Sequence, residues 1–101
     1  MDFKLSWTDR ALADLEEVVR HYREEEKSLE AAKKVGTAII ERVEVLQTFL
    51  DIGPRYPRKN GVHREVLCYE YRIFYRVDHD TRVVHIARIW HGRQDPSSLE
   101  L

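Results

Sequence analysis

The sequence lacks the features of a disulfide-stabilised or membrane-spanning protein. Its single cysteine, Cys68, cannot form a disulfide within the chain and has no second thiol to help bind a metal. Apolar runs are only a few residues long, whereas a membrane helix needs about twenty. The first residues, MDFKLSW, also lack the basic and apolar stretches of a secretion signal. We therefore expect a cytoplasmic protein without membrane contact.

Length and composition favour one compact unit. The chain has 101 residues, of which 43% are hydrophobic, and this supports one hydrophobic core. Glycine and proline are scarce, with four and three residues, and two of each lie in the segment DIGPRYPRKNG at 51–61. We expect a single domain over residues 1–101, with its main break in periodic structure at that segment.

Charge is balanced in total but uneven along the chain. Residues 1–50 contain eight Lys or Arg against eleven Asp or Glu, whereas residues 51–101 contain nine against seven. The basic residues of the second half are arginines apart from Lys59, and four of the five histidines lie there too. Arginine pairs equally well with phosphates and carboxylates. This half therefore suits an RNA surface, an acidic protein partner, or ordinary solvated strands.

Periodicity in the first half predicts a strand followed by two helices. Residues 2–7 alternate apolar and polar side chains, as in a half-buried strand. Thr8 is a suitable N-cap for a helix over about 9–25, and Ser28 is suitable for a second helix reaching about residue 50. A short polar turn between them predicts an antiparallel hairpin. Gly53 and Pro54 then end the helical pattern.

The second half changes to a strand period. HREVLCY at 63–69 and YRIFYRV at 71–77 read as two strands joined by a tight turn, and DHDT at 78–81 leads to a last strand at 82–90. That last strand does not alternate cleanly, which indicates a β-bulge. We predict an α+β fold in which an N-terminal strand, a helix hairpin and a three-strand antiparallel meander form one sheet with both helices on one face.

Arginines within apolar strands are the most distinctive chemical feature. No glycine-rich phosphate loop, serine-nucleophile motif or metal-ligand spacing occurs, so we expect neither cofactor nor metal. His85 and His91 share a parity on the last strand but lie too far apart to bind one ion. Alternation in residues 71–77 predicts that Arg72 and Arg76 lie on the open face, away from the helices. The predicted binding surface comprises Arg64, Arg72, Phe74, Arg76, Arg88 and Arg93.

Several segments together resemble the RelE/ParE superfamily of toxins from type II toxin–antitoxin systems. They are WTDRALADLEEVVRHY, GPRYPRKNGVHREV, YEYRIFYRVD and VVHIARIWHGRQDP, and the similarity covers nearly the whole chain. It implies a toxin that inhibits bacterial growth and is neutralised by a cognate antitoxin in a hetero-oligomer. The antitoxin would wrap a partly acidic, extended segment around the toxin, which suits the arginines of the sheet.

The RelE-like members imply a metal-independent endoribonuclease that cuts mRNA on the ribosome. This chemistry needs a group that activates the ribose hydroxyl, positive charge near the phosphate, and an acid for the leaving oxygen. On the resemblance, Arg72, His91 and Arg93 stand at the matching positions. After Asp95, however, only PSSLEL follows, without the tyrosine or histidine that RelE-like nucleases commonly place there.

The ParE-like members imply inhibition of DNA gyrase and no nuclease activity. The long helix hairpin, FYRVD and above all HGRQDP resemble them, and the overall neutrality favours a protein target over RNA. We expect a ParE-like toxin, with a RelE-like nuclease and a non-toxic binding relative as the alternatives. His91 joins the expected binding surface for target or antitoxin.

Purely structural roles are open for the same residues. Arg72 and Arg76 can pair with Glu65, Glu70 or Asp78 across the sheet. His91 can cap the last strand by bonding to the backbone. The aromatic side chains Trp7, Tyr71, Tyr75 and Trp90 are more typical of core residues than of platforms for base stacking.

Overall fold

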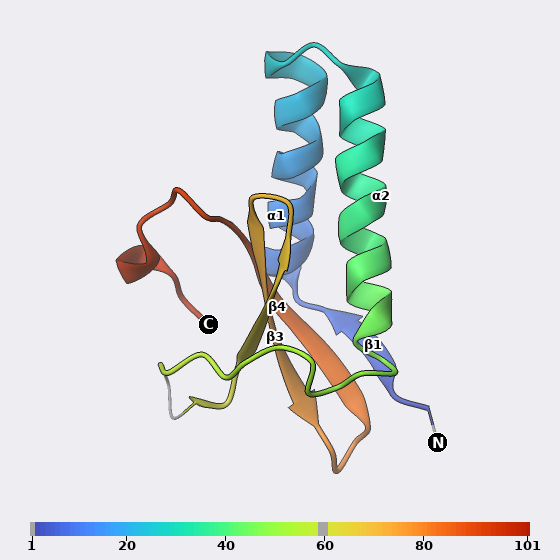
Figure 1. Cartoon of the computed structure of the whole chain (residues 1–101), viewed down its shortest axis with the longest axis vertical. Helices are drawn as coiled ribbons and strands as arrows, with labels where there is room; N and C mark the ends of the chain where they lie inside the picture. The colour runs from blue at the N-terminus through green and yellow to red at the C-terminus, as the bar shows by residue number, and fades with distance from the viewer. Residues whose placement is uncertain (1, 59–60) are drawn as a thin grey trace.

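A computed structural model of the chain describes residues 2–58 and 61–101 (Figure 1). Lys59 and Asn60, within the predicted loop at 51–61, lie outside the described residues. The elements, in chain order, are β1 (Lys4–Trp7), α1 (Asp9–Arg20), the π-helical turn η1 (His21–Glu25), α2 (Leu29–Val45), β2 (Arg64–Cys68), β3 (Tyr71–Asp78), β4 (Val83–His91) and the 3₁₀ turn η3 (Pro96–Ser98).

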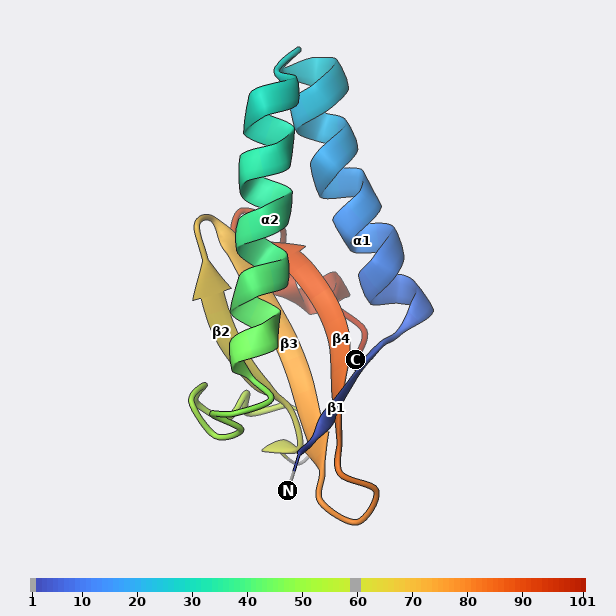
Figure 2. The ribbon, with the colours of Figure 1, turned by 90° about the vertical axis from the view of Figure 1, so that its right-hand side faces the viewer.

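The strands form a four-stranded sheet in the order β1-β4-β3-β2. β2, β3 and β4 are an antiparallel meander, and β1 pairs with β4 in parallel. α1 and α2 pack side by side against one face of the sheet, and the tip of their hairpin extends beyond it (Figures 1 and 2). The predicted α+β fold and the order of its elements are confirmed.

The helix starts follow the predicted caps. The Thr8 hydroxyl oxygen accepts the amide hydrogen of Ala11 at 3.1 Å, and the Ser28 hydroxyl oxygen accepts that of Ala31 at 3.0 Å. The predicted end of the second helix near residue 50 is wrong, because α2 ends at Val45. The chain turns there toward the sheet, where the buried Tyr75 hydroxyl donates to the carbonyl of Leu50 at 2.9 Å.

A β-bulge interrupts β4, as predicted. Phe74 pairs with Arg88 and Tyr75 pairs with Ile86, so Ala87 is the extra residue. The bulge reverses the facing of later residues relative to earlier ones. The prediction that His85 and His91 point to the same face of the sheet is therefore wrong. His85 lies opposite Arg76 on one face, whereas His91 lies opposite Tyr71 on the other.

At the bulge and beyond it, side chains of Thr8 and of α1 cover the edge of β4. β1 pairs with β4 only as far as Ile86. The Thr8 hydroxyl donates to the Ala87 carbonyl at 3.0 Å, and the Asp14 carboxylate accepts the Ile89 amide hydrogen at 2.9 Å. The same carboxylate accepts two hydrogen bonds from the Arg88 guanidinium, at 2.8 and 3.1 Å. These contacts hold α1 against the sheet.

The face of the sheet away from the helices is covered, not open as predicted. Phe74, predicted as part of an exposed binding surface, is fully buried in a second apolar cluster with Tyr56, Trp90 and Leu99. The C-terminal tail runs across this side of the sheet (Figures 1 and 2) and supplies Leu99. The sequence indicated which face Phe74 occupies but not that the tail returns over it.

Replacing Asp14 by alanine should lower the free energy of unfolding by about 2–4 kcal/mol, because it leaves the partly buried Arg88 and the Ile89 amide without their acceptor. Urea denaturation followed by circular dichroism measures this loss. Glu17→Ala is the matched control, since it removes an exposed carboxylate from the same helix. Equal stability of the two variants would contradict the importance of the Asp14 contacts.

Candidate functional site

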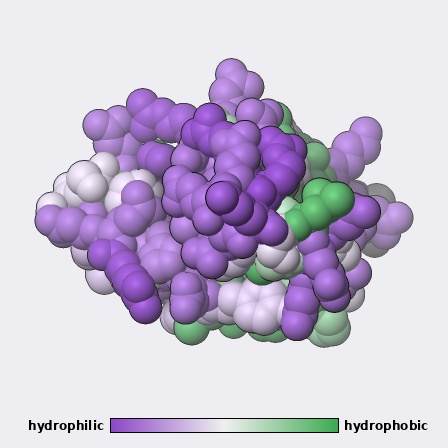
Figure 3. Space-filling view, turned by 90° about the horizontal axis from the view of Figure 1, so that it is seen from above, coloured by the Kyte–Doolittle hydropathy of each residue, from purple (hydrophilic) through white to green (hydrophobic). Residues whose placement is uncertain are grey.

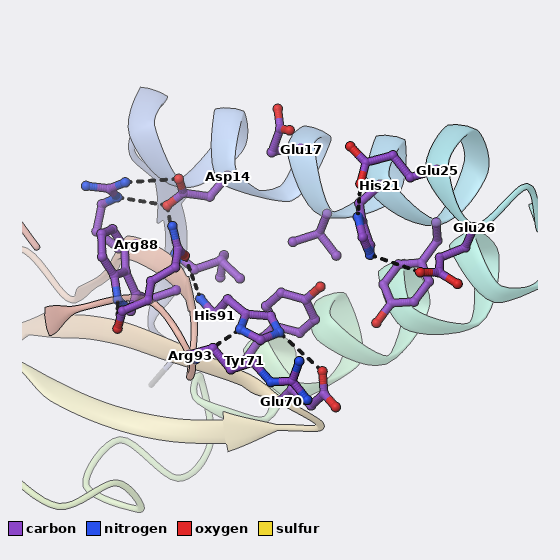
Figure 4. A pocket seen from close by; sticks show the side chains of 15 residues that line it. Asp14, Glu17, His21, Glu25, Glu26, Glu70, Tyr71, Arg88, His91 and Arg93 are labelled. Atoms are coloured by element: carbon purple, nitrogen blue, oxygen red, sulfur yellow. Dashed lines mark hydrogen bonds and ion pairs between the residues drawn. The ribbon is translucent and has the colours of Figure 1, made fainter.

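A groove lies between the first helix and the end of the sheet, and we take it as the candidate site (Figure 4). Its volume is about 740 Å³. One wall consists of α1 and η1, and the other consists of the start of β3 and the segment that ends β4. Its apolar lining residues are Val18, Tyr22, Tyr71, Ile89 and Trp90. Helix packing against the edge of β4 therefore creates a depression with an apolar base.

Carboxylates dominate the charged lining of this groove. The acidic residues are Asp14, Glu17, Glu25, Glu26 and Glu70, against two arginines, Arg88 and Arg93. Asp14 and Arg88 neutralise each other in the contact described above. Glu17 pairs with Arg20, so the remaining lining has three carboxylates and one guanidinium, together with His21 and His91. The groove is acidic on balance.

A phenol lies at the base of the groove. Tyr71 is buried, and its ring meets the imidazole of His91 edge-on, with the ring centroids 5.3 Å apart. Burial raises the pKa of the Tyr71 hydroxyl well above its usual value, and the neighbouring Tyr22 raises it further. Tyr71 therefore remains a neutral phenol at physiological pH and adds no negative charge to the site.

His91 is held by hydrogen bonds at both ring nitrogens. Its Nδ1 accepts the amide hydrogen of Arg93 at 3.0 Å, so the ring proton lies on Nε2. Nε2 lies 3.2 Å from Glu70 Oε2 and donates to it. The imidazole is thus a neutral link between the end of β4 and the β2–β3 turn. The structural role considered for His91, bonding to the backbone at the end of the strand, is confirmed.

The segment HGRQ forms a compact turn at this point. Gln94 Oε1 accepts the His91 amide hydrogen at 3.0 Å, and the Gln94 amide donates to the His91 carbonyl at 3.0 Å. The Gly92 amide donates to the Glu70 carbonyl at 2.8 Å. A Cβ atom at residue 92 would stand only 3.2 Å from that carbonyl oxygen, so glycine permits the close approach. The motif closes one end of the groove.

Arg72 lies on the opposite face of the sheet from His91. It pairs across the strands with Trp90, whereas Tyr71 pairs with His91. Its Nε donates to Glu65 Oε2 at 2.7 Å, and its guanidinium lies over the Phe74 ring, 5.1 Å from the centroid. The hydrogen bond to Glu65 raises the pKa of Arg72 above its already high usual value. The ion pair considered for Arg72 is confirmed.

The other arginines of the predicted surface do not form one cluster. Arg64 was expected beside Arg72, but it lies opposite Tyr75 on the helix-covered face and donates to the Gly53 carbonyl at 2.7 Å. Arg88 shares a face with Phe74, yet its guanidinium reaches past the strand edge to Asp14. The remaining two lie apart: Arg93 is exposed at the groove, and Arg76 borders a separate small depression with His63 and His85.

The acidic side of the groove was not predicted from the sequence. The run Glu24–Glu26 lies at the end of the first predicted helix and in the polar turn after it, where the sequence gives no sign of a groove. In the structure, Glu25 and Glu26 line the groove, as does Glu70 from the β2–β3 turn. The sequence signal was present in the acidic run, but the fold decides that Glu25 and Glu26 face a depression.

Comparison with known proteins identifies the family. A family model described as the ParE toxin of the type II toxin-antitoxin system parDE matches residues 5–96. This chain belongs to the ParE toxin family. A search of curated proteins found no significant match. The resemblance stated from the sequence is thereby confirmed at the level of the family.

One similar solved structure belongs to a ParDE system, and two others share the fold. A chain of the chromosomal ParDE toxin–antitoxin system from P. aeruginosa is 27% identical, with a TM-score of 0.74 over 88% of this chain and 95% of that one. The RelBE2 toxin–antitoxin complex from Mycobacterium tuberculosis shares the fold at 20% identity, with a TM-score of 0.69 over 90% and 99%. The isolated E. coli RelE toxin does so at 20% identity, with a TM-score of 0.58 over 94% and 89%.

Two further features concern only the described residues of this ParE-family toxin. In residues 2–58 and 61–101, no group of three or more His, Cys, Asp or Glu side chains is arranged to hold a metal ion. None of the helices in this part of the chain is long and apolar enough to cross a membrane.

A double-mutant cycle on Arg72 and Glu65 should give a coupling energy of about 1 kcal/mol, because both side chains are about four-fifths buried and directly bonded. The free energies of unfolding of Arg72→Ala, Glu65→Ala and the double variant measure it. The exposed pair Arg10 and Glu100 is the matched comparison and should give a coupling near zero. Additive effects at both pairs would show that Arg72 is not held by Glu65.

Proposed function

We propose that this ParE-family toxin arrests bacterial growth by inhibiting DNA gyrase and does not cleave mRNA. The observation that carries this choice is the separation of the nuclease candidates. Arg72 projects from one face of the sheet and His91 from the other. Phosphodiester cleavage requires an acid–base group and a cationic group at the same phosphate. His91 and Arg93 are adjacent, but Arg72 lies behind the strand.

The hydrogen bonds of His91 and Arg72 add to this argument. In its present bonding, the imidazole of His91 already donates through Nε2 to Glu70 and accepts through Nδ1 from the Arg93 amide. Arg72 is likewise held by a carboxylate, that of Glu65. A ribose or phosphate group would have to displace one of these bonds to reach either side chain. Structural roles for both residues account for their presence in the sequence.

Electrostatics around His91 also oppose RNA. A phosphate approaching the imidazole would meet Glu70 at bonding distance and the carboxylates of Glu25 and Glu26 across the groove. RNA binding relies on accumulated positive charge, and each nearby carboxylate works against it. A protein target does not carry this penalty, because its surface offers both signs of charge.

We further propose that a cognate antitoxin neutralises this toxin as part of a toxin–antitoxin complex. Two of the similar structures, ParDE and RelBE2, were solved as toxin–antitoxin systems. The residues predicted to contact antitoxin or target are Arg64, Arg72, Phe74, Arg76, Arg88, His91 and Arg93, and we propose all of them except the fully buried Phe74 as contacts. Among them Arg76 and Arg93 are the most available, since Phe74 is buried and Arg72 and Arg88 are held by carboxylates.

Expression of the chain in a bacterial host should stop growth, and co-expression of the protein encoded beside it should restore growth. The purified toxin should inhibit gyrase supercoiling and leave mRNA on stalled ribosomes intact. Plasmid topology on agarose gels and mapping of mRNA ends measure the two activities. Normal growth with folded, soluble protein would contradict the toxin proposal itself.

Arg72→Ala and His91→Ala distinguish the two activities. If the protein inhibits gyrase, neither change removes a catalytic group, so each variant should keep part of its inhibition, reduced by any lost target contact and by any weakened folding that circular dichroism measures. Arg20→Ala, on the outer surface of α1, is the control. mRNA cleavage that both changes abolish, while Arg20→Ala retains it, would establish the RelE-like activity instead.

A further inference from the structure

The groove combines a buried apolar base with an exposed acidic rim. Val18, Tyr71 and Ile89 at its base are 6%, 5% and 4% exposed. At the rim, the side chains of Glu25 and Glu70 are 71% and 62% exposed. Figure 4 shows these carboxylates on opposite sides, Glu25 from the helix and Glu70 from the sheet. A ligand along the groove would therefore meet negative charge on both sides.

The π-helical turn η1 brings two carboxylates to the same side of the helix. The Glu26 amide donates to the His21 carbonyl at 3.0 Å, a bond that spans five residues instead of four. Glu25 lies 2.8 Å from one ring nitrogen of His21, and Glu26 lies 3.6 Å from the other. In a regular α-helix, residues five apart would point in different directions. The wider turn thus places Glu26 beside Glu25 at the groove.

The intramolecular partners do not neutralise this rim. A single imidazole, His21, lies between the carboxylates of Glu25 and Glu26, and it carries at most one positive charge. Glu70 contacts His91, which is in the neutral form with its proton on Nε2. Arg93 is the one guanidinium of the lining that is not bound to Asp14. The rim keeps excess negative charge for an incoming group.

We infer that this groove binds a segment of the toxin's protein target that carries lysine or arginine beside apolar side chains. The inference rests on the proposed function, since it assigns the groove to that target. Apolar side chains would pack over the base formed by Val18, Tyr71 and Ile89, and cationic ones would reach Glu25, Glu26 and Glu70. An acidic antitoxin segment suits the arginines outside the groove and is repelled inside it.

The surface around the groove agrees with a charged ligand. The end of the molecule formed by the hairpin tip is mostly hydrophilic when seen from above (Figure 3). The tip sequence REEEKSLE carries four glutamates against one arginine and one lysine. Negative charge therefore extends from the groove to this end of the molecule, and it would attract a cationic segment before contact.

Two fluorescent probe peptides of about twelve residues test the charge preference without gyrase. One repeats leucine and lysine at helical spacing, and the other carries glutamate in place of each lysine. Fluorescence anisotropy with the full-length toxin should show at least about tenfold tighter binding of the lysine peptide at low salt. Equal binding of the two peptides, or tighter binding of the glutamate peptide, would overturn the inference.

Variants connect this preference to the groove. The triple change Glu25→Gln, Glu26→Gln and Glu70→Gln should weaken lysine-peptide binding about tenfold and reduce gyrase inhibition to a similar extent. The control pair Glu41→Gln and Glu44→Gln alters exposed glutamates on α2, outside the groove, and should change neither. Circular dichroism confirms that both variants are folded.

The outcomes separate this inference from the proposed function. Wild-type toxin that fails to inhibit gyrase contradicts the proposed function, while the peptides still decide the charge preference of the groove. Wild-type inhibition that the triple variant retains in full overturns the assignment of the groove to the target and leaves gyrase inhibition intact.

Discussion

The contact between the Asp14 carboxylate and the edge of β4 is the constraint on which the site depends. A bulge at Ala87 ends the pairing with β1 and leaves the later residues of β4 without a strand neighbour on that side among the described residues. Buried backbone amides need acceptors. The Asp14 carboxylate is the acceptor for the Ile89 amide and also pairs with Arg88. A single side chain therefore bonds to the edge of β4 and holds α1 beside it.

The groove follows from this arrangement. Because α1 is held at the edge of β4, its last turns and η1 extend past the end of the sheet (Figure 1), and the space between them is closed on the sheet side by Tyr71 and the turn at His91. Gly92 allows that turn to approach the Glu70 carbonyl, and Gln94 ties it back to the strand. The segment HGRQ therefore has a definite structural task, to shape one end of the groove.

The sequence predicted the fold well because its evidence is local. Alternation, helical spacing and the caps Thr8 and Ser28 are read within a few residues, and all of them operate in the structure.

The site was predicted less well because it depends on contacts distant in sequence. Alternation correctly placed Phe74 away from the helices, but burial under Leu99 depends on where a tail 25 residues later returns. Predicting where Arg64 lies relative to Arg72 required the register of β2 against β3, which no local sequence pattern determines.

The uneven charge along the chain has a three-dimensional counterpart. The acidic first half supplies the helical wall of the groove, and the basic second half supplies the sheet, whose arginines Arg72 and Arg88 are held by carboxylates while Arg76 borders a depression on the far face. A near-zero net charge thus combines an acidic groove with a sheet whose arginines are mostly paired or lie apart. On the proposed function, an acidic antitoxin segment at Arg76 and a basic target segment in the groove would occupy different faces of the sheet. If both proposals hold, the two segments would not compete directly for one site, and neutralisation would act by covering or distorting the groove from outside it.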